Sequence, residues 1–408
     1  MATAINIKEC IRDEDSYFNI KRFKLLGFSV DKPLKIWDLK GSNFISKNIF
    51  QSYVQKSQDI ICEASKVLKK PDVIFDIVNS EDNSQINKHF QTSEWKPNLI
   101  IPQTFQFNPY ESFENLKILE SYLNYYYEHS DVLFVPNIRT NRTKKIQNPE
   151  NTEKQKTVTE KIIDYESYVK FVDEIVQILN YRNNKPIFVP LSLRFSIQDI
   201  GNLAENYLKK EYFNIWVDFE AQNLSKAQRG KLKAFLMKIE ASGRFDDVII
   251  YTSNMRRSIS ENSKNPKSQS SDPISSVLGS NIIGGNRNPP VYIPPDKTPA
   301  NGERIPADQL PDYKASIFDR DSYYYINSSI SHESTEIKEL LKYKHHNTLI
   351  NSIRINDEFR VQTDKFLENY DLKGYISEKT MLKDDPTITS QIFEQKSKFK
   401  ETSLLDFL

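Results

Sequence analysis

The sequence predicts an α/β fold, a (β/α)8 barrel of the TIM type with a helical C-terminal extension. In three stretches a short apolar run ends at proline and polar residues follow: Leu99–Pro102, Leu133–Pro136 and Ile187–Pro190. An unbroken apolar run is typical of a parallel strand buried on both faces. Because proline lacks the N–H group that strand pairing needs, we expect pairing to end there. The polar residues that follow should lie at the carboxyl end of a strand, where α/β folds place their functional groups.

Eight buried strands are predicted, most of them separated by helical patterns. The predicted strands are Leu34–Leu39, Asp72–Val78, Asn98–Phe105, Asp131–Ile138, Pro186–Leu193, Phe213–Phe219, Asp247–Thr252 and Asn281–Gly284. Apolar residues near a 3.6-residue period predict helices over Ile45–Leu68, Ser112–Tyr127, Tyr165–Tyr181, Ile197–Leu208 and Ala227–Ile239. Eight strands alternating with helices favour a barrel, and a doubly wound open sheet is the alternative.

The remaining segments divide the chain around this predicted barrel. A short N-terminal segment covers residues 1–33, and the barrel is expected over 34–331. Three polar or proline-rich segments are expected to be mobile loops at its carboxyl-terminal face: 140–160, 258–273 and 286–311. A helical extension over 332–381 and a flexible polar tail over 382–408 are expected to follow.

Composition excludes several classes of protein. The 408 residues carry a formal net charge of +1, and no apolar run approaches the ~20 residues of a membrane span. The N-terminus shows no secretory signal, and the only two cysteines, Cys10 and Cys62, cannot form a cysteine-rich metal site. We therefore expect a cytoplasmic protein with free thiols, no membrane association, no cofactor and no bound metal. The near-neutral charge still allows a local basic patch.

Acidic residues at predicted strand ends are the candidate catalytic groups. Asp218 and Glu220 end the sixth predicted strand and should point to the same side, about 7 Å apart along the chain. Such a pair can serve as general acid and base, as a nucleophile, or as ligands of a hard cation. Alternatively, one of them caps the next helix or pairs with an arginine such as Arg194. The first two predicted strands offer two further candidates, Asp38 and Asp76.

Other strand ends carry groups suited to phosphate. Guanidinium groups bind phosphate or carboxylate in a bidentate manner, and the N–H groups of a glycine turn can approach a phosphate closely. The candidate phosphate- or substrate-binding residues are Arg139, Ser192, Arg194, Asn254, Arg256, Gly284, Gly285 and Arg287. A structural ion pair and a plain tight turn are the alternatives. Because no histidine lies at a predicted strand end, a histidine general base is not expected.

The region from Ser275 to Arg360 resembles the end of a tRNA-guanine transglycosylase barrel. That family enters a late strand through a leucine-glycine-x-aspartate turn, to which Val277–Ile283 is similar. Its later helix bears a His-Asn-Leu motif followed by an Ile-Arg pair, and Leu340–Leu349 with Ile353–Arg354 is similar to that helix. The resemblance implies a barrel fold and a nucleic-acid substrate, tRNA or DNA.

Two features of that family are absent. Its zinc site needs three cysteines and a histidine, whereas the corresponding Phe318–Tyr325 contains no cysteine. The place of its nucleophilic aspartate is taken by Ile283 and Gly284. Base exchange through a covalent sugar–enzyme intermediate needs such a carboxylate. Either the chemistry has moved to one of the four candidate carboxylates or it has been lost.

The last eight residues resemble the sliding-clamp (PCNA) interacting box. Leu404, Phe407 and Leu408 fall in register with the apolar positions of that motif, and Glu401 replaces its glutamine. An apolar end on a polar leash suits a peptide that docks into a groove, here of a sliding clamp. The alternative is a terminal helix that folds back on the domain.

Three functional hypotheses follow. The first is a transglycosylase-like barrel that exchanges bases in nucleic acid, with Asp218 or Glu220 as nucleophile or base and with the arginines, Lys144 and Lys145 holding phosphates. The second is a non-catalytic barrel that binds nucleic acid or a protein partner. The third is an unrelated hydrolase or lyase that uses Asp218 and Glu220 and could employ Mg²⁺.

Overall fold

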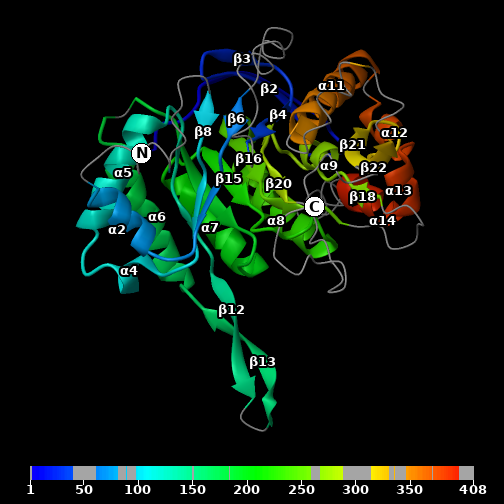
Figure 1. Ribbon diagram of the computed structural model, residues 1–408. Helices are drawn as coiled ribbons and strands as arrows, with labels where there is room; N and C mark the ends of the chain where they lie inside the picture. Colours follow the sequence, from blue (N-terminus) through cyan, green and yellow to red (C-terminus); the bar gives the residue numbers. More distant parts are fainter. Residues whose placement is uncertain are drawn as a thin grey trace, which may run out of the picture.

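The chain has a mixed α/β fold in which short parallel strands are followed by helices (Figure 1). The computed structural model describes residues 2–39, 61–80, 89, 98–148, 151–182, 184–258, 267–287, 314–329, 335, 346–369 and 371–394. Among these residues, none of the helices combines the length and the apolar character that crossing a bilayer requires. The sliding-clamp-like peptide at Leu404, Phe407 and Leu408 lies outside them.

The largest sheet contains six parallel strands. Its order is β10 (Leu133–Phe134), β14 (Ile187–Ser192), β15 (Asn214–Asp218), β16 (Ile249–Ser253), β19 (Ile282–Ile283) and β4 (Leu34–Lys35). In register, Ser192 lies beside Asp218, and Asp218 lies beside Ser253. The last residues of these three strands therefore lie side by side at one edge.

Two further parallel sheets have three strands each. One has the order β5 (Trp37–Asp38), β6 (Cys62–Glu63) and β8 (Leu99–Ile100). The other has the order β7 (Lys66–Leu68), β9 (Gln103–Phe105) and β11 (Asn137–Ile138). Strands β5 and β11 directly follow β4 and β10 in the chain. Seven of the eight predicted strands are thus confirmed as parallel strands, several of them interrupted by one or two residues.

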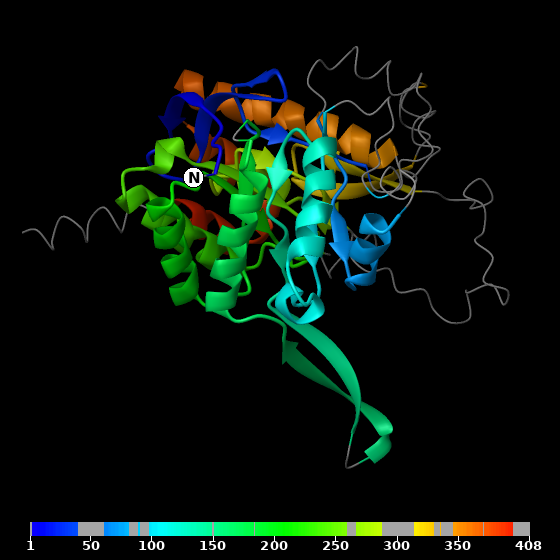
Figure 2. The same cartoon turned by 90° about the vertical axis from the view of Figure 1, so that its left-hand side faces the viewer.

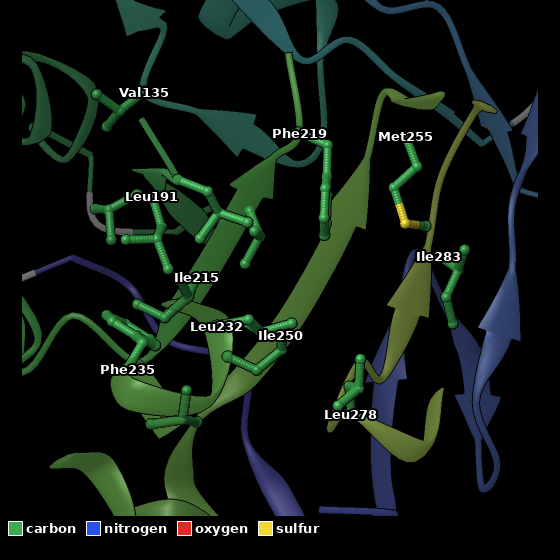
Figure 3. Packing of buried hydrophobic residues seen from close by; sticks show 14 of the residues in the cluster. Val135, Leu191, Ile215, Phe219, Leu232, Phe235, Ile250, Met255, Leu278 and Ile283 are labelled. Carbon is green, nitrogen blue, oxygen red and sulfur yellow. The ribbon is translucent and has the colours of Figure 1, made fainter. Parts of the chain in front are cut away.

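Helices cover one face of the strands. After α4 (Pro109–Ser112) come α5 (Lys117–His129), α6 (Tyr165–Leu179), α7 (Ile197–Lys209) and α8 (Lys226–Ala241), close to the predicted positions. Three of them begin at a side chain that accepts a backbone N–H of the first turn: Asp164, Ser196 and Ser225. Figure 3 shows how Ile215 and Ile250 of the sheet lie against Leu232 and Phe235 of α8.

A second apolar cluster occupies the opposite face of the strands. It includes Ile36, Phe134, Phe188, Trp216 and Tyr251. The antiparallel sheet of β1 (Ile7–Arg12), β2 (Asn19–Leu25) and β3 (Phe28–Val30) contributes further members at the amino ends of the strands. The parallel strands are therefore buried on both faces, as their continuous apolar sequence predicts.

The second predicted strand is wrong. Residues Asp72–Val78 form helix α2, which follows Pro71 and buries Ile74 and Ile77 on one face. The second parallel strand of the chain is instead formed by β6 and β7, which lie within the predicted helix Ile45–Leu68. Residues 45–60 of that predicted helix lie outside the described residues. A short apolar run fits a strand and a buried helix face equally well, so periodicity alone misassigned both segments.

The polar segment 140–160 is a hairpin rather than a loop. Strands β12 (Asn141–Asn148) and β13 (Asn151–Lys161) pair in antiparallel register. Figures 1 and 2 show this hairpin projecting away from the rest of the molecule. Pairing satisfies the backbone N–H and C=O groups without an apolar core, and the β-branched residues of the segment favour it.

The other two predicted loops are only partly described. In 258–273, Ser268–Gln269 forms β18 and helix α9 (Asp272–Val277) begins with Pro273 in its first turn, while 259–266 lies outside the described residues. Of 286–311, only Asn286–Arg287 is described, as strand β20, which pairs with β17 (Met255–Arg256). Strand β18 pairs with the hairpin of β21 (Lys314–Asp319) and β22 (Tyr324–Ser329).

The C-terminal region is helical beyond the expected boundary. It contains α11 (His346–Asn369), α12 (Leu372–Ser377), α13 (Thr380–Asp384), α14 (Pro386–Thr389) and the π-helix η6 (Ser390–Glu394). The flexible tail expected from residue 382 is therefore wrong for residues up to 394. Ile392 and Phe393 are buried, and Gln391 accepts hydrogen bonds from Arg229 and Lys233 of α8. These contacts hold the segment against the helical layer.

Candidate functional site

Polar side chains meet at the carboxyl ends of β9, β11, β14, β15 and β16. We call this group the strand-end cluster; its members are Thr104, Asn137, Arg139, Ser192, Arg194, Asp218, Glu220 and Asn254. Asp218 lies at its centre and is 1% exposed. Its Oδ2 accepts hydrogen bonds from Thr104 Oγ1 at 2.6 Å and Asn137 Nδ2 at 3.1 Å. Its Oδ1 accepts from Asn254 Nδ2 and from the backbone N–H of Glu220, both at 2.9 Å.

Glu220 connects the buried part of the cluster to two arginines. Its Oε1 accepts from Ser192 Oγ at 2.7 Å and from Asn137 Nδ2 at 3.3 Å. Its Oε2 lies 2.5 Å from Arg194 Nε and 4.0 Å from Arg139 Nε. The arginine side chains are 28% and 26% exposed, whereas that of Glu220 is 1% exposed. Two partly exposed guanidinium groups therefore share one buried carboxylate.

The protonation of Glu220 reflects this burial. Removal from water raises the pKa of the Glu220 carboxyl, and the neighbouring Asp218 raises it further. Arg194 and the hydrogen bond from Ser192 oppose the shift without cancelling it. When Glu220 is protonated, its negative charge no longer offsets the arginines, and the cluster becomes more attractive to an anion.

Three residues in or beside the cluster have a left-handed backbone, which is strained at two of them, Glu220 and Ala221. Glu220, Ala221 and Asn254 have φ angles of 50°, 61° and 59° in the left-handed region, which disfavours residues other than glycine and asparagine. A hydrogen bond of 2.9 Å from Ala221 N to Asn254 O joins the two turns that contain them. Strain of this kind persists where surrounding contacts enforce it, and it concentrates at functional sites.

A second group of carboxylates lies around the glycine turn that follows β19. Glu63 Oε2 accepts from the backbone N–H of Gly285 at 2.7 Å and from the hydroxyl of Tyr251. A Cβ atom at residue 284 would collide with that same carboxylate oxygen and hydroxyl. A Cβ at residue 285 would lie 2.7 Å from Asp38 Oδ2. Residue 284 therefore has no room for any side chain unless Glu63 and Tyr251 move.

The structure separates the sequence-predicted residues into distinct places. Arg139, Ser192, Arg194, Asp218, Glu220 and Asn254 belong to the strand-end cluster. Asp38, Gly284 and Gly285 form the second group, and Arg256 and Arg287 are register partners in β17 and β20. Asp76 is wrong as a strand-end residue, because it lies exposed on helix α2.

Sequence reasoning missed Thr104, Glu63 and Tyr168. Thr104 follows Pro102 by two residues, so the proline-ended pattern could have found it. Glu63 ends the run Ile60–Cys62, but that run was assigned to a helix. Tyr168 reaches the cluster from α6 and donates its hydroxyl to Asn137 Oδ1 at 3.0 Å, a contact between distant segments that leaves no local signal.

Comparison with known proteins gives no family for this chain. No family model matches the sequence, and no curated protein matches it. Within the described residues, no group of three or more His, Cys, Asp or Glu side chains is arranged to hold a metal ion. The functional proposal therefore rests on the geometry of the strand ends.

Replacing Gly284 with alanine tests the tight packing of this turn. We expect Gly284→Ala to lower the free energy of unfolding by about 1–3 kcal/mol, because the new methyl group must displace Glu63 or Tyr251. The matched control is Gly201→Ala in the interior of α7, where the nearest atom would be Lys238 Cε at 3.6 Å. That change should stabilise the protein by roughly 0.5–1 kcal/mol. Urea unfolding measures both, and a neutral Gly284→Ala would contradict the crowding.

The raised pKa of Glu220 predicts a pH-dependent stability. As pH rises from the ordinary value of 4.5 through the raised native pKa, the unfolded chain releases this proton before the folded one does. The free energy of unfolding should therefore fall over that interval, and Glu220→Gln should flatten the fall. In the control, Glu205→Gln, the profile above pH 4.5 should be unchanged, since Lys238 lowers the pKa of Glu205. Urea unfolding at successive pH values decides, and a steeper fall in Glu220→Gln would refute the assignment.

Proposed function

We propose that the parallel strands of the three sheets form one closed (β/α)8 barrel. Strands β4 and β5 are separated only by Ile36, and β10 and β11 only by two residues. The six-stranded sheet runs from β4 to β10, while β5 pairs with β6 and β11 pairs with β9. Segments β6–β7 and β8–β9 pair with each other through β6 with β8 and β7 with β9. Following the pairings thus leads back to the first strand.

Contacts across the strands support this closure. The rings of Phe134 on β10 and Tyr251 on β16 have centroids 5.3 Å apart, although β14 and β15 lie between them. A flat sheet would separate positions three strands apart by roughly 14 Å. The 2.6 Å hydrogen bond from Thr104 on β9 to Asp218 on β15 spans a similar number of strands. Strong curling brings such residues together.

We further propose that the strand ends bind the phosphate groups of a nucleic acid. The observation that carries this proposal is the pair of partly exposed arginines, Arg139 and Arg194, held by the buried Glu220. Both carboxylates of the cluster, Asp218 and Glu220, are buried whereas the two guanidinium groups are partly exposed, so the charge presented to solvent is positive. Guanidinium groups oriented in this way suit bidentate binding of phosphate oxygens.

A second group of basic residues indicates that the ligand is a polyanionic polymer rather than a single small anion. Arg256 and Arg287 lie side by side in β17 and β20, beyond the end of β16. The neighbouring guanidinium group of Arg257 lies 3.4 Å from the ring centroid of Tyr325. Tyr325 is 1% exposed, so its ring holds the Arg257 guanidinium group by a cation–π contact. The three arginines offer further contacts to a phosphate backbone. The transglycosylase resemblance, with its nucleic-acid substrate, agrees with this assignment.

The double variant Arg139→Gln/Arg194→Gln tests phosphate binding. We expect at least tenfold weaker binding of a fluorescein-labelled DNA oligonucleotide, because two phosphate contacts are lost. The slope of log affinity against log salt should become shallower by about 1.4–1.8. Fluorescence anisotropy at several salt concentrations measures both quantities.

The matched control is Arg12→Gln/Arg244→Gln. Both arginines are partly exposed and lie near Asp246 and Asp247, at the amino end of β16. They should leave affinity and salt slope unchanged. Equal losses in the two variants would show a general charge effect and would contradict a site at the strand ends.

Base exchange is a second candidate function, favoured by the position of Asp38. Its carboxylate lies against Gly285, beside the residue that takes the place of the transglycosylase nucleophile. A carboxylate there could attack the sugar carbon that bears the base, so that the base leaves with the bonding electron pair. The incoming base would then displace the carboxylate.

Asp38→Asn tests this chemistry. Incorporation of labelled guanine into tRNA or DNA should be lost, because an amide is a poor nucleophile. Asp76→Asn, an exposed change on helix α2, should have no effect. Undiminished incorporation by Asp38→Asn would rule out this role. A wild-type protein that incorporates no base would rule out base exchange and leave phosphate binding standing.

A further inference from the structure

The hairpin of β12 and β13 begins at the strand-end cluster. Its first residue, Asn141, follows Arg139 by two positions, and Figure 1 shows the hairpin leaving the molecule at the end opposite to β1–β3. Figure 2 shows the same projection from a second direction. We call the segment Asn141–Lys161 the arm. Whatever binds the arginines of the cluster can therefore also meet the arm.

Positive charge is concentrated in the arm. Its sequence contains six basic and three acidic residues, a net charge of +3, whereas the whole chain carries +1. The rest of the chain is therefore slightly acidic. A positively charged projection on such a body favours a polyanionic partner.

The pairing register distributes these residues unequally between the two faces of the arm. Directly opposed residues share a face. One face, the amide face, contains the positions of Asn141, Thr143, Lys145, Gln147, Gln155, Thr157, Thr159 and Lys161. The other face contains the positions of Arg142, Lys144, Ile146, Lys156, Val158 and Glu160. At these register-paired positions the amide face thus has no acidic and no large apolar residue, whereas the other face has both.

We propose that the amide face binds in the major groove of double-stranded DNA, next to the strand held at the strand-end cluster; this inference rests on the proposed nucleic-acid binding. The major groove of B-form DNA is about 12 Å wide and admits a two-stranded β-ribbon. Asparagine, glutamine and threonine donate to and accept from base edges, while lysine contacts phosphate or guanine. The major groove of duplex RNA is too deep and narrow for such a ribbon.

A pair of double variants in the full-length protein tests the face. Lys145→Gln/Lys161→Gln removes two charges from the amide face, and Lys144→Gln/Lys156→Gln removes two from the other face of the same strands. The first should weaken binding of fluorescein-labelled duplex DNA at least fivefold and reduce the salt slope by about 1.8. The second should change affinity less than twofold. Equal effects of the two variants would overturn the assignment to the amide face.

Removal of the arm separates this inference from the proposed function. Asn141 and Lys161 are register partners, so an Asn-Gly turn can join them in place of residues 142–160. The shortened protein should keep its thermal unfolding temperature, lose most of its affinity for duplex DNA and still bind a single strand through Arg139 and Arg194. If removal of the arm leaves the affinity for duplex DNA unchanged, the role of the arm is refuted while the proposed function stands. If Arg139→Gln/Arg194→Gln binds DNA as tightly as the unchanged protein, the proposed function is refuted. Tighter binding of duplex RNA than of duplex DNA would overturn the choice of DNA.

Discussion

The carboxylate of Asp218 is the contact on which the arrangement of the strand ends depends. Its two oxygens accept four hydrogen bonds from groups on or beside β9, β11, β15 and β16. Burial of a charged carboxylate costs free energy unless such donors bind it, so the four hydrogen bonds depend on one another. One of them fixes the N–H of Glu220 and so helps to hold that residue in its left-handed conformation. The placement of Glu220, and through it of Arg194, follows from Asp218.

The two neighbouring carboxylates therefore have different tasks. Asp218 is surrounded by neutral donors and ties strands together, whereas Glu220 faces the two arginines. The sequence pattern allows either carboxylate to act as acid, base, nucleophile or cation ligand, with an ion pair to an arginine such as Arg194 as the alternative. In the structure, Glu220 does pair with Arg194. Because both oxygens of each are already engaged, their geometry favours an architectural role for Asp218 and an anchoring role for Glu220. The hydrogen bond to Glu220 sets the orientation of the Arg194 guanidinium group, whereas Arg139 lies 4.0 Å from the same carboxylate oxygen.

Sequence patterns predicted the parts of the fold that depend on local signals. The proline-ended runs placed Asn137, Ser192 and Arg194 near strand ends, because burial on both faces forces a continuous apolar run. The expectation that pairing stops at the proline is wrong for Pro190, since β14 continues through it to Ser192, which pairs with Asp218. Asp72–Val78 failed since seven apolar-rich residues suit either a strand or a helix face. The loop predicted over the arm was wrong for the opposite reason, because the pairing of its backbone needs no apolar pattern. Contacts such as Thr104 with Asp218 join residues 114 positions apart, and no local pattern encodes them.

Gly284 is packed directly against the side chains of neighbouring strands. Glu63 from β6 and Tyr251 from β16 occupy the space that a side chain at residue 284 would need. The backbone N–H of the next residue, Gly285, donates to the same Glu63 oxygen. Glu63 and Asp38 approach the backbone of Gly284 and Gly285 closely because neither glycine has a Cβ atom. An aspartate at residue 284 would require Glu63 and Tyr251 to move first, so the carboxylates at this turn come from the neighbouring strands.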